Sequence, residues 1–266
     1  MEFREVDSKK EKTAKKHRSK LRAVIFAVSF LIIIALAVWI LSYTVLFPVE
    51  HIKVTGSGVY SSQEIIDAAN LSTGDKLYSI SGKSTEELLT TKLPYIKMVE
   101  LKRSILPDTT LEIIVTETSD VFCYEYKNMY YTADKDNKVL SKFTAQPQGT
   151  TLVKTNKKFD IALGKTIVMD ENEFLNLTTI HSKLSNNGIS IGYIDISNEN
   201  DVQILIDNRF IVELGTVSNL DGKIAHLNGM IEKIIEKNGK DTMGRIDLSA
   251  WTNKNQRAYY EPSNIF

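Results

Sequence analysis

The chain has 266 residues, of which 42% are hydrophobic and 25% are charged, and its 33 Lys and Arg residues balance its 33 Asp and Glu residues. This composition excludes wholesale disorder and allows one large domain or two small ones. The single cysteine, Cys123, excludes an intrachain disulfide. We therefore expect a fold stabilised by its core, with a buried and inert thiol.

The balanced charge hides a basic N-terminus that precedes a long apolar run. Residues 1–22 carry nine Lys or Arg against four Asp or Glu, and Ala23 to Val49 carry none of either. A membrane crossing needs about 20 apolar residues, whereas a signal-peptide core has roughly 7 to 15. We expect an uncleaved transmembrane helix over 23–48, although Ala35-Leu36-Ala37 resembles a cleavage site. The positive-inside rule then leaves the tail in the cytoplasm, as an orientation signal rather than an arm for nucleic acid or anionic lipid, and the rest outside.

A first outer module is predicted over residues 49–118. The alternation of Ile52 and Val54 indicates a strand. Ser61 to Glu64 have the spacing of a capping box, in which the serine and glutamate side chains satisfy amides of the first helical turn. Ser84 to Glu87 repeat this spacing, which predicts a second helix ending at Pro94.

Residues 94–117 are typical of a charged β-hairpin. Leu111, Ile113 and Val115 share one face, so they should pack against the helices. Pro107 and Asp108 predict the turn. The module therefore has the order strand, helix, helix, strand, strand. The charged residues are expected on a solvated rim or docking edge of this module, and the candidates are Arg103, Asp108 and Glu117.

A second module is predicted over residues 119–262, followed by a short tail over 263–266. Aromatic strand-like segments begin near Val121, and Asp170 can cap a helix. Residues 202–214 predict a hairpin, and apolar residues at helical spacing over 220–235 predict a second helix. Two further strands are expected near the end. The fold class is α+β, with helices packed on a larger mixed sheet.

No catalytic, cofactor-binding or metal site is predicted. The four histidines are scattered, and common motifs for hydrolases, metal sites and phosphate loops are missing. Asp195 and Asp247 lie in similar contexts, "YIDIS" and "RIDLS", so a pair of carboxylates for acid and base work is one interpretation. A strand-end position explains each of these carboxylates more simply. We expect a protein that is not an enzyme.

The order of these features resembles a bacterial division protein family, called FtsQ in some lineages and DivIB in others. The first module is similar to a polypeptide-transport-associated (POTRA) domain, with Pro94-Tyr95-Ile96 and Leu106-Pro107-Asp108-Thr109 in the family's positions. The second is similar to the family's β domain, with Leu214-Gly215 and Ile246-Asp247-Leu248. Many relatives place Arg after that triplet, where this chain has Ser249. This departure weakens any claim that a basic group is needed there.

The resemblance implies a non-enzymatic scaffold of the division septum in the bacterial cell membrane. Its implied partners are FtsL-like and FtsB/DivIC-like membrane proteins and the septal peptidoglycan synthases, with no cofactor, nucleic acid or small-molecule substrate. By analogy with strand addition at sheet edges, the last strand, Arg257 to Glu261, is the expected partner edge. The candidate partner-binding residues are Ile246, Leu248, Arg257, Ala258, Tyr259, Tyr260 and Glu261.

Charged replacements of Tyr259 and Tyr260 are expected to weaken partner capture without unfolding the outer part. Two other functions remain open from the sequence. The first is a POTRA-containing factor for polypeptide secretion or assembly. The second is an enzyme outside the cytoplasm that acts on cell-wall material.

Overall fold

The computed structural model describes residues 24–40, 47–252 and 254–264. Residues 24–40 are helical, and within the described part of the chain no helix is both long and apolar enough to span a membrane. The predicted span over 23–48 lies partly outside the described residues, and the predicted tail over 1–22 lies wholly outside them.

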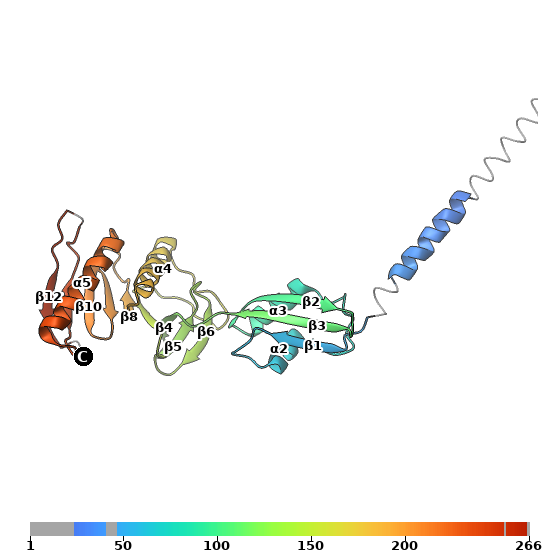
Figure 1. Cartoon of the computed structure of the whole chain (residues 1–266), viewed down its shortest axis with the longest axis horizontal. Coiled ribbons are helices and arrows are strands. Elements are labelled where there is room, and N and C mark those ends of the chain that lie inside the picture. Colours follow the sequence, from blue (N-terminus) through green and yellow to red (C-terminus); the bar gives the residue numbers. More distant parts are fainter. Residues whose placement is uncertain (1–23, 41–46, 253, 265–266) are drawn as a thin grey trace, which may run out of the picture. The chain divides into compact units, whose positions relative to one another are not determined.

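The chain forms two compact units (Figure 1). Unit 1 consists of residues up to Glu86 together with Val99–Val115, and unit 2 consists of Glu87–Met98 together with the residues from Thr116 onward. The end of one helix, the start of one strand and the end of another strand are therefore grouped with the second unit.

The first sheet has three strands in the order β1-β3-β2, with β1 parallel to β3. The elements follow the predicted order of strand, helix, helix, strand, strand. They are β1 (His51–Thr55), α2 (Ser62–Ala69), α3 (Gly82–Lys92), β2 (Ile96–Ser104) and β3 (Thr110–Glu117). Leu111, Ile113 and Val115 are buried, which confirms the predicted inner face of β3.

The first of the two predicted capping boxes is confirmed and the second is wrong. Ser61 accepts a hydrogen bond from the amide of Glu64, whose side chain accepts one from the amide of Ser61. Helix α3 begins at Gly82, two residues before the predicted capping residue Ser84. The Ser81 hydroxyl accepts the amide of Ser84 at 3.3 Å, so Ser81 takes the capping position.

The second sheet has nine strands in the order β12-β11-β10-β9-β8-β7-β4-β5-β6. Two helices, α4 (Glu171–Asn186) and α5 (Leu220–Asn238), accompany it, and Asp170 caps α4 as predicted. The strands are β4 (Phe122–Tyr126), β5 (Met129–Ala133), β6 (Val139–Phe143), β7 (Thr151–Lys154), β8 (Ile191–Asp195), β9 (Val202–Ile206), β10 (Phe210–Gly215), β11 (Gly244–Asp247) and β12 (Tyr259–Pro262).

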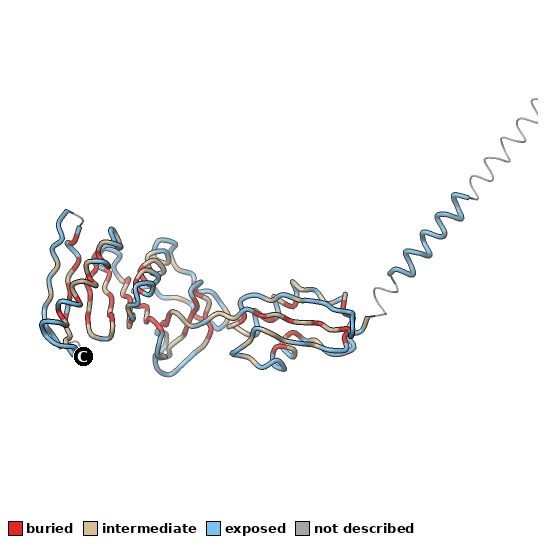
Figure 2. The backbone as a smooth tube through the Cα atoms, viewed as in Figure 1, coloured by how far each residue is buried: buried red, intermediate tan, exposed pale blue. Residues whose placement is uncertain are grey.

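Both helices cover the same face of this sheet. Ile204, Val212 and Ile246 lie opposite one another on neighbouring strands, and all three are fully buried. They belong to one core cluster with Leu177 of α4 and Leu227 of α5. Figure 2 shows the buried residues in red along the strands of this sheet. The core therefore fixes the sheet out to β11, the neighbour of the last strand.

Candidate partner-binding edge

Strand β12 forms one edge of the nine-stranded sheet. It pairs antiparallel with β11, placing Tyr260 opposite Ile246 and Tyr259 opposite Asp247. In such a pair about half of the backbone amides and carbonyls point away from the neighbouring strand. In the described ranges no strand pairs with that outer side. This outer side is the candidate surface for strand addition, and β12 begins at Tyr259 rather than at the predicted Arg257.

The two tyrosines of β12 have different environments. Tyr259 is 60% exposed. The ring of Tyr260 makes an edge contact with Phe210, with centroids 6.4 Å apart, and its hydroxyl donates to the carbonyl of Met243 at 2.9 Å. Burial raises the pKa of this phenol. The expectation that both tyrosines tolerate a charge therefore needs correction, because Tyr260 helps to hold β12 on the core.

The other predicted contact residues support the edge or flank it. Ile246 and Leu248 are 0% exposed, so their side chains lie in the core and do not face a partner. Ala258 is half-buried against the same core, and Arg257 is exposed just before the strand. Glu261 is exposed opposite Arg245. Tyr259 is thus the candidate best placed for a side-chain contact.

Gly244 is a further residue on which this edge depends, and it was not among the residues predicted from the sequence. A Cβ at this position would lie 2.4 Å from the carbonyl oxygen of Glu261 and 2.6 Å from Cε2 of Tyr260. Only glycine lets β12 approach β11 here. The available signal was a glycine two residues before the buried Ile246, within the segment that forms the strand.

The three predicted docking residues of the first module do not form one patch. Arg103 donates through Nη2 to the carbonyl of Ile80 at 2.7 Å and through Nε to that of Leu77 at 3.2 Å. Asp108 is exposed in the β2–β3 turn, whereas Glu117 is the last residue of β3. Asp108 and Glu117 therefore lie at opposite ends of one strand. The guanidinium of Arg103 holds the loop that contains Leu77 and Ile80.

The two aspartates considered as an acid and base pair are also apart. Asp195 accepts the amide of Ser197 at 2.9 Å, and Asp247 accepts the amide of Ser249 at 2.8 Å. Asp195 lies on β8 and Asp247 on β11, with β9 and β10 between them. At roughly 4.8 Å per strand spacing, this separation is about 14 Å. Each carboxylate therefore organises the turn that follows its own strand.

The described residues contain no cluster of three or more His, Cys, Asp or Glu side chains placed to hold a metal ion. Cys123 is buried, and burial raises the pKa of its thiol to about 11. A thiol with such a pKa is a poor nucleophile at neutral pH.

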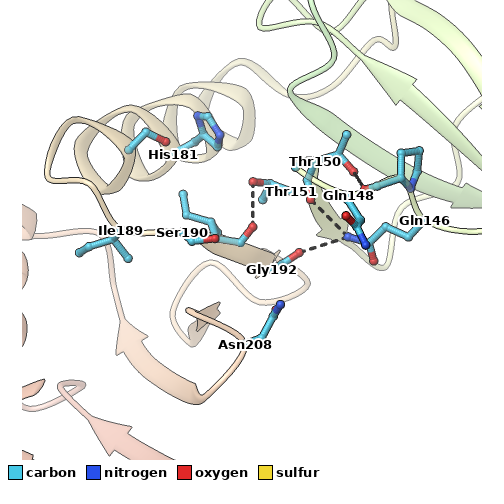
Figure 3. Close-up of a pocket in the computed structure, with 13 residues that line it drawn as sticks. Gln146, Gln148, Thr150, Thr151, His181, Ile189, Ser190, Gly192 and Asn208 are labelled. Carbon is cyan, nitrogen blue, oxygen red and sulfur yellow. Dashed lines mark hydrogen bonds between the residues drawn. The ribbon is translucent and has the colours of Figure 1, made fainter. Parts of the chain in front are cut away.

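A polar cavity of about 580 Å³ lies in unit 2 (Figure 3). The side chain of Gln146 donates to the carbonyls of Thr150 and Gly192 across it. His181 packs edge-on against Phe122, and burial lowers the pKa of its imidazole. Within the described part of the chain, no hydrogen bond joins His181 to a hydroxyl in this lining. The cavity thus lacks the linked base and nucleophile of a hydrolytic site.

Comparisons with known proteins give matches to bacterial division proteins. Residues 47–118 match the family model of the FtsQ-type POTRA domain. The chain is 29% identical to the cell division protein DivIB of Clostridium acetobutylicum, over 76% of this chain and 80% of that protein. It is 25% identical to DivIB of Bacillus subtilis, over 76% and 73% respectively. The solved major extracytoplasmic domain of DivIB from Geobacillus stearothermophilus aligns with 12% identity and a TM-score of 0.29, over 47% of this chain and 99% of that one.

Proposed function

The chain belongs to the FtsQ/DivIB family of bacterial cell division proteins, and we propose that it acts in division as a scaffold without catalytic chemistry. In this proposal it holds FtsL-like and FtsB/DivIC-like membrane proteins at the septum and helps to organise septal peptidoglycan synthesis. The observation that carries the proposal is the edge strand β12, whose outer side is unoccupied in the described residues.

The mode of binding that we propose is addition of a partner strand to β12. Main-chain hydrogen bonds along an edge supply affinity, and alternate side chains supply specificity. Tyr259 offers a large exposed aromatic ring at this edge, a side chain that often dominates binding energy at interfaces. Tyr260 and the fully buried Ile246 hold the strand in place beneath it.

We further propose the arrangement of the chain in the cell. Residues 1–22 form the cytoplasmic tail, residues 23–48 anchor the chain in the cell membrane with a single span, and the remainder lies outside. There, residues 49–118 form the POTRA-like domain for recruitment or docking, residues 119–262 form the β domain for partner binding, and residues 263–266 form the tail. The uncharged run from Ala23 to Val49 supports the anchor.

The binding proposal is tested by capture of the two small partners on the full chain carrying Tyr259→Lys. Leu175→Lys is a matched control, because Leu175 is also 60% exposed but lies on α4. We expect Tyr259→Lys to weaken capture about tenfold or more, as loss of about 1.4 kcal/mol would do. The control should bind as the wild type does. Equal capture by all three chains would show that β12 is not the interface.

A further inference from the structure

The turn between β2 and β3 exposes apolar side chains. This segment, Ile105–Asp108, is called the hairpin tip below. Leu106 is 80% exposed and Ile105 is 41% exposed. Hairpin turns are normally built from Gly, Asn, Asp and Ser, with Pro where the backbone angle suits it. Pro107 and Asp108 fit that pattern, but the two apolar residues before them contribute little to the core of unit 1.

The hairpin tip lies at the end of the first sheet where β1 begins. Strand β1 runs parallel to β3, and His51 is opposite Thr110. The amide of Glu50 donates to the carbonyl of Thr109 at 2.8 Å. The residues that lead into β1 therefore lie directly beside the end of the tip, as the start of β1 and the β2–β3 turn show in Figure 1.

Aromatic and basic groups gather at the same end. The ring of Phe47 makes an edge contact with that of Tyr78, with centroids 5.8 Å apart. Arg103, at the end of β2, holds the loop that contains Tyr78 through the carbonyls of Leu77 and Ile80. Aromatic rings beside apolar and basic side chains suit the boundary between lipid and water.

The contacts of the first module begin inside the uncharged run itself. The carbonyl of Phe47 accepts the amide of Leu77 at 3.1 Å, and Val49 is only 1% exposed. If a crossing of about 20 residues starts at Ala23, about four residues remain before Phe47. Four residues reach at most about 14 Å when fully extended. With the anchor proposed above, the first module therefore starts within that distance of the bilayer.

We infer that the hairpin tip inserts into the interface of the bilayer that holds the chain's own apolar run. Leu106 enters the apolar boundary layer, and Ile105 and the ring of Phe47 lie beside it. The contact that we propose is apolar because Leu106 and Ile105 supply it, whereas Asp108, the exposed carboxylate of the same tip, stays on the water side. Glu50 and Arg103 keep their charges but are held by hydrogen bonds to the amide of Thr109 and to the carbonyls of Leu77 and Ile80. Insertion restricts how unit 1 is oriented on the membrane. This inference rests on the anchor proposed above.

The test places a fluorescent label at the tip of the full chain in vesicles of phosphatidylcholine and phosphatidylglycerol. Leu106→Cys is labelled in a Cys123→Ala background, and nitroxide groups on the lipid acyl chains serve as quenchers. Val59→Cys is the matched control, because Val59 is 54% exposed and follows the opposite end of β1. We expect several-fold stronger quenching at position 106 than at position 59, with little change at high salt.

Ile105→Cys, labelled in the same way, is a second variant that shows whether the result depends on the substitution at position 106. Its fluorescence should also be quenched. Equal quenching at positions 105, 106 and 59 would overturn the inference, including the case in which a protein rather than lipid covers the tip. Retention of the chain in carbonate-washed vesicles reports the anchor separately. Loss of retention would overturn the anchor and this inference together, whereas capture of partners by β12 is measured independently of both.

Discussion

The two edge strands of the nine-stranded sheet, β6 and β12, differ in what covers their outer sides. At the β6 edge, the amide of Val139 donates to the carbonyl of Lys165, and the amide of Gly164 donates to the carbonyl of Val139, both at 2.9 Å. Residues of the same chain therefore cover the start of this strand. At the β12 edge, the described residues provide pairing only on the side of β11.

Side chains reinforce the closed edge. The ammonium of Lys138 donates to the carbonyls of Thr90 and Ile96, at 3.0 and 3.1 Å. The hydroxyl of Tyr95 lies 2.8 Å from that of Ser141 on β6. An unprotected edge invites unwanted strand pairing, so proteins usually cover it. In the described residues the start of β6 is covered in this way, whereas the outer side of β12 is not, and this difference supports the proposal that β12 binds a partner.

Of the variants that test this difference between the two edges, Gly244→Ala is expected to have the largest effect, because it should displace β12 from the sheet. The new methyl group would overlap the backbone of Glu261, so β12 must move away from β11. We expect a loss of about 1–3 kcal/mol in the free energy of unfolding, as for other overpacked sites, and faster hydrogen exchange across β12. Urea denaturation and exchange measured by mass spectrometry give the two values.

Gly229→Ala is the control for that variant, because nothing lies within 4 Å of a Cβ at this position of α5. Alanine is the better helix former by up to about 1 kcal/mol, so the control should be unchanged or more stable. If Gly244→Ala kept β12 protected from exchange, the close approach at Gly244 would not be what seats the strand.

A smaller effect is expected from Lys138→Met, which should loosen the closed edge. The variant leaves the carbonyls of Thr90 and Ile96 without the ammonium donor, at a cost of about 1–2 kcal/mol. Exchange should rise in residues 90–96 and stay unchanged in β12. Lys135→Met, at an exposed position nearby, is the comparison for loss of a charge alone. If the two variants were equally stable, the Lys138 hydrogen bonds would not stabilise this edge, and backbone pairing alone would cover it.

The smallest effect is a pH dependence that comes from the same lysine. Burial is the main cause that lowers the pKa of Lys138 below the ordinary lysine value of about 10.4. Between the lowered and the ordinary pKa, the unfolded chain binds more protons than the folded chain, so stability rises with pH. The free energy of unfolding is measured by denaturation for the wild type and for Lys138→Met through this pH window. The wild-type value minus the variant value should rise with pH. A flat difference would mean that the ammonium is not desolvated.

Local patterns predicted much of the fold because they act within a few residues. The caps at Ser61 and Asp170 and the alternation along β3 needed only neighbouring side chains and backbone amides. Ser81 was missed because Ser84 and Glu87 offer an equivalent spacing three residues later. Sequence spacing alone does not distinguish two such starts.

The candidate edge was predicted less completely, because its details depend on distant contacts. Tyr259 and Tyr260 are both aromatic, so alternation could not show which ring faces the core until Phe210 was seen beside Tyr260. Lys223 is a clearer example of a residue whose environment the sequence does not reveal, since this lysine is only 1% exposed. Its ammonium donates to the carbonyl of Thr216 at 2.8 Å and to that of Leu214, and no pattern in α5 marks it as buried.

The position of β12 in the chain has a consequence for biosynthesis. It follows every other strand, so it is the last of them to be made and to leave the ribosome. Until it arrives, β11 is the outermost strand, and Ile246 lacks its cross-strand neighbour Tyr260. A chain interrupted before Tyr259 would present a different edge, without the exposed ring. In the binding proposal made above, a chain that lacks β12 is therefore expected to capture the two small partners more weakly than a chain that contains it.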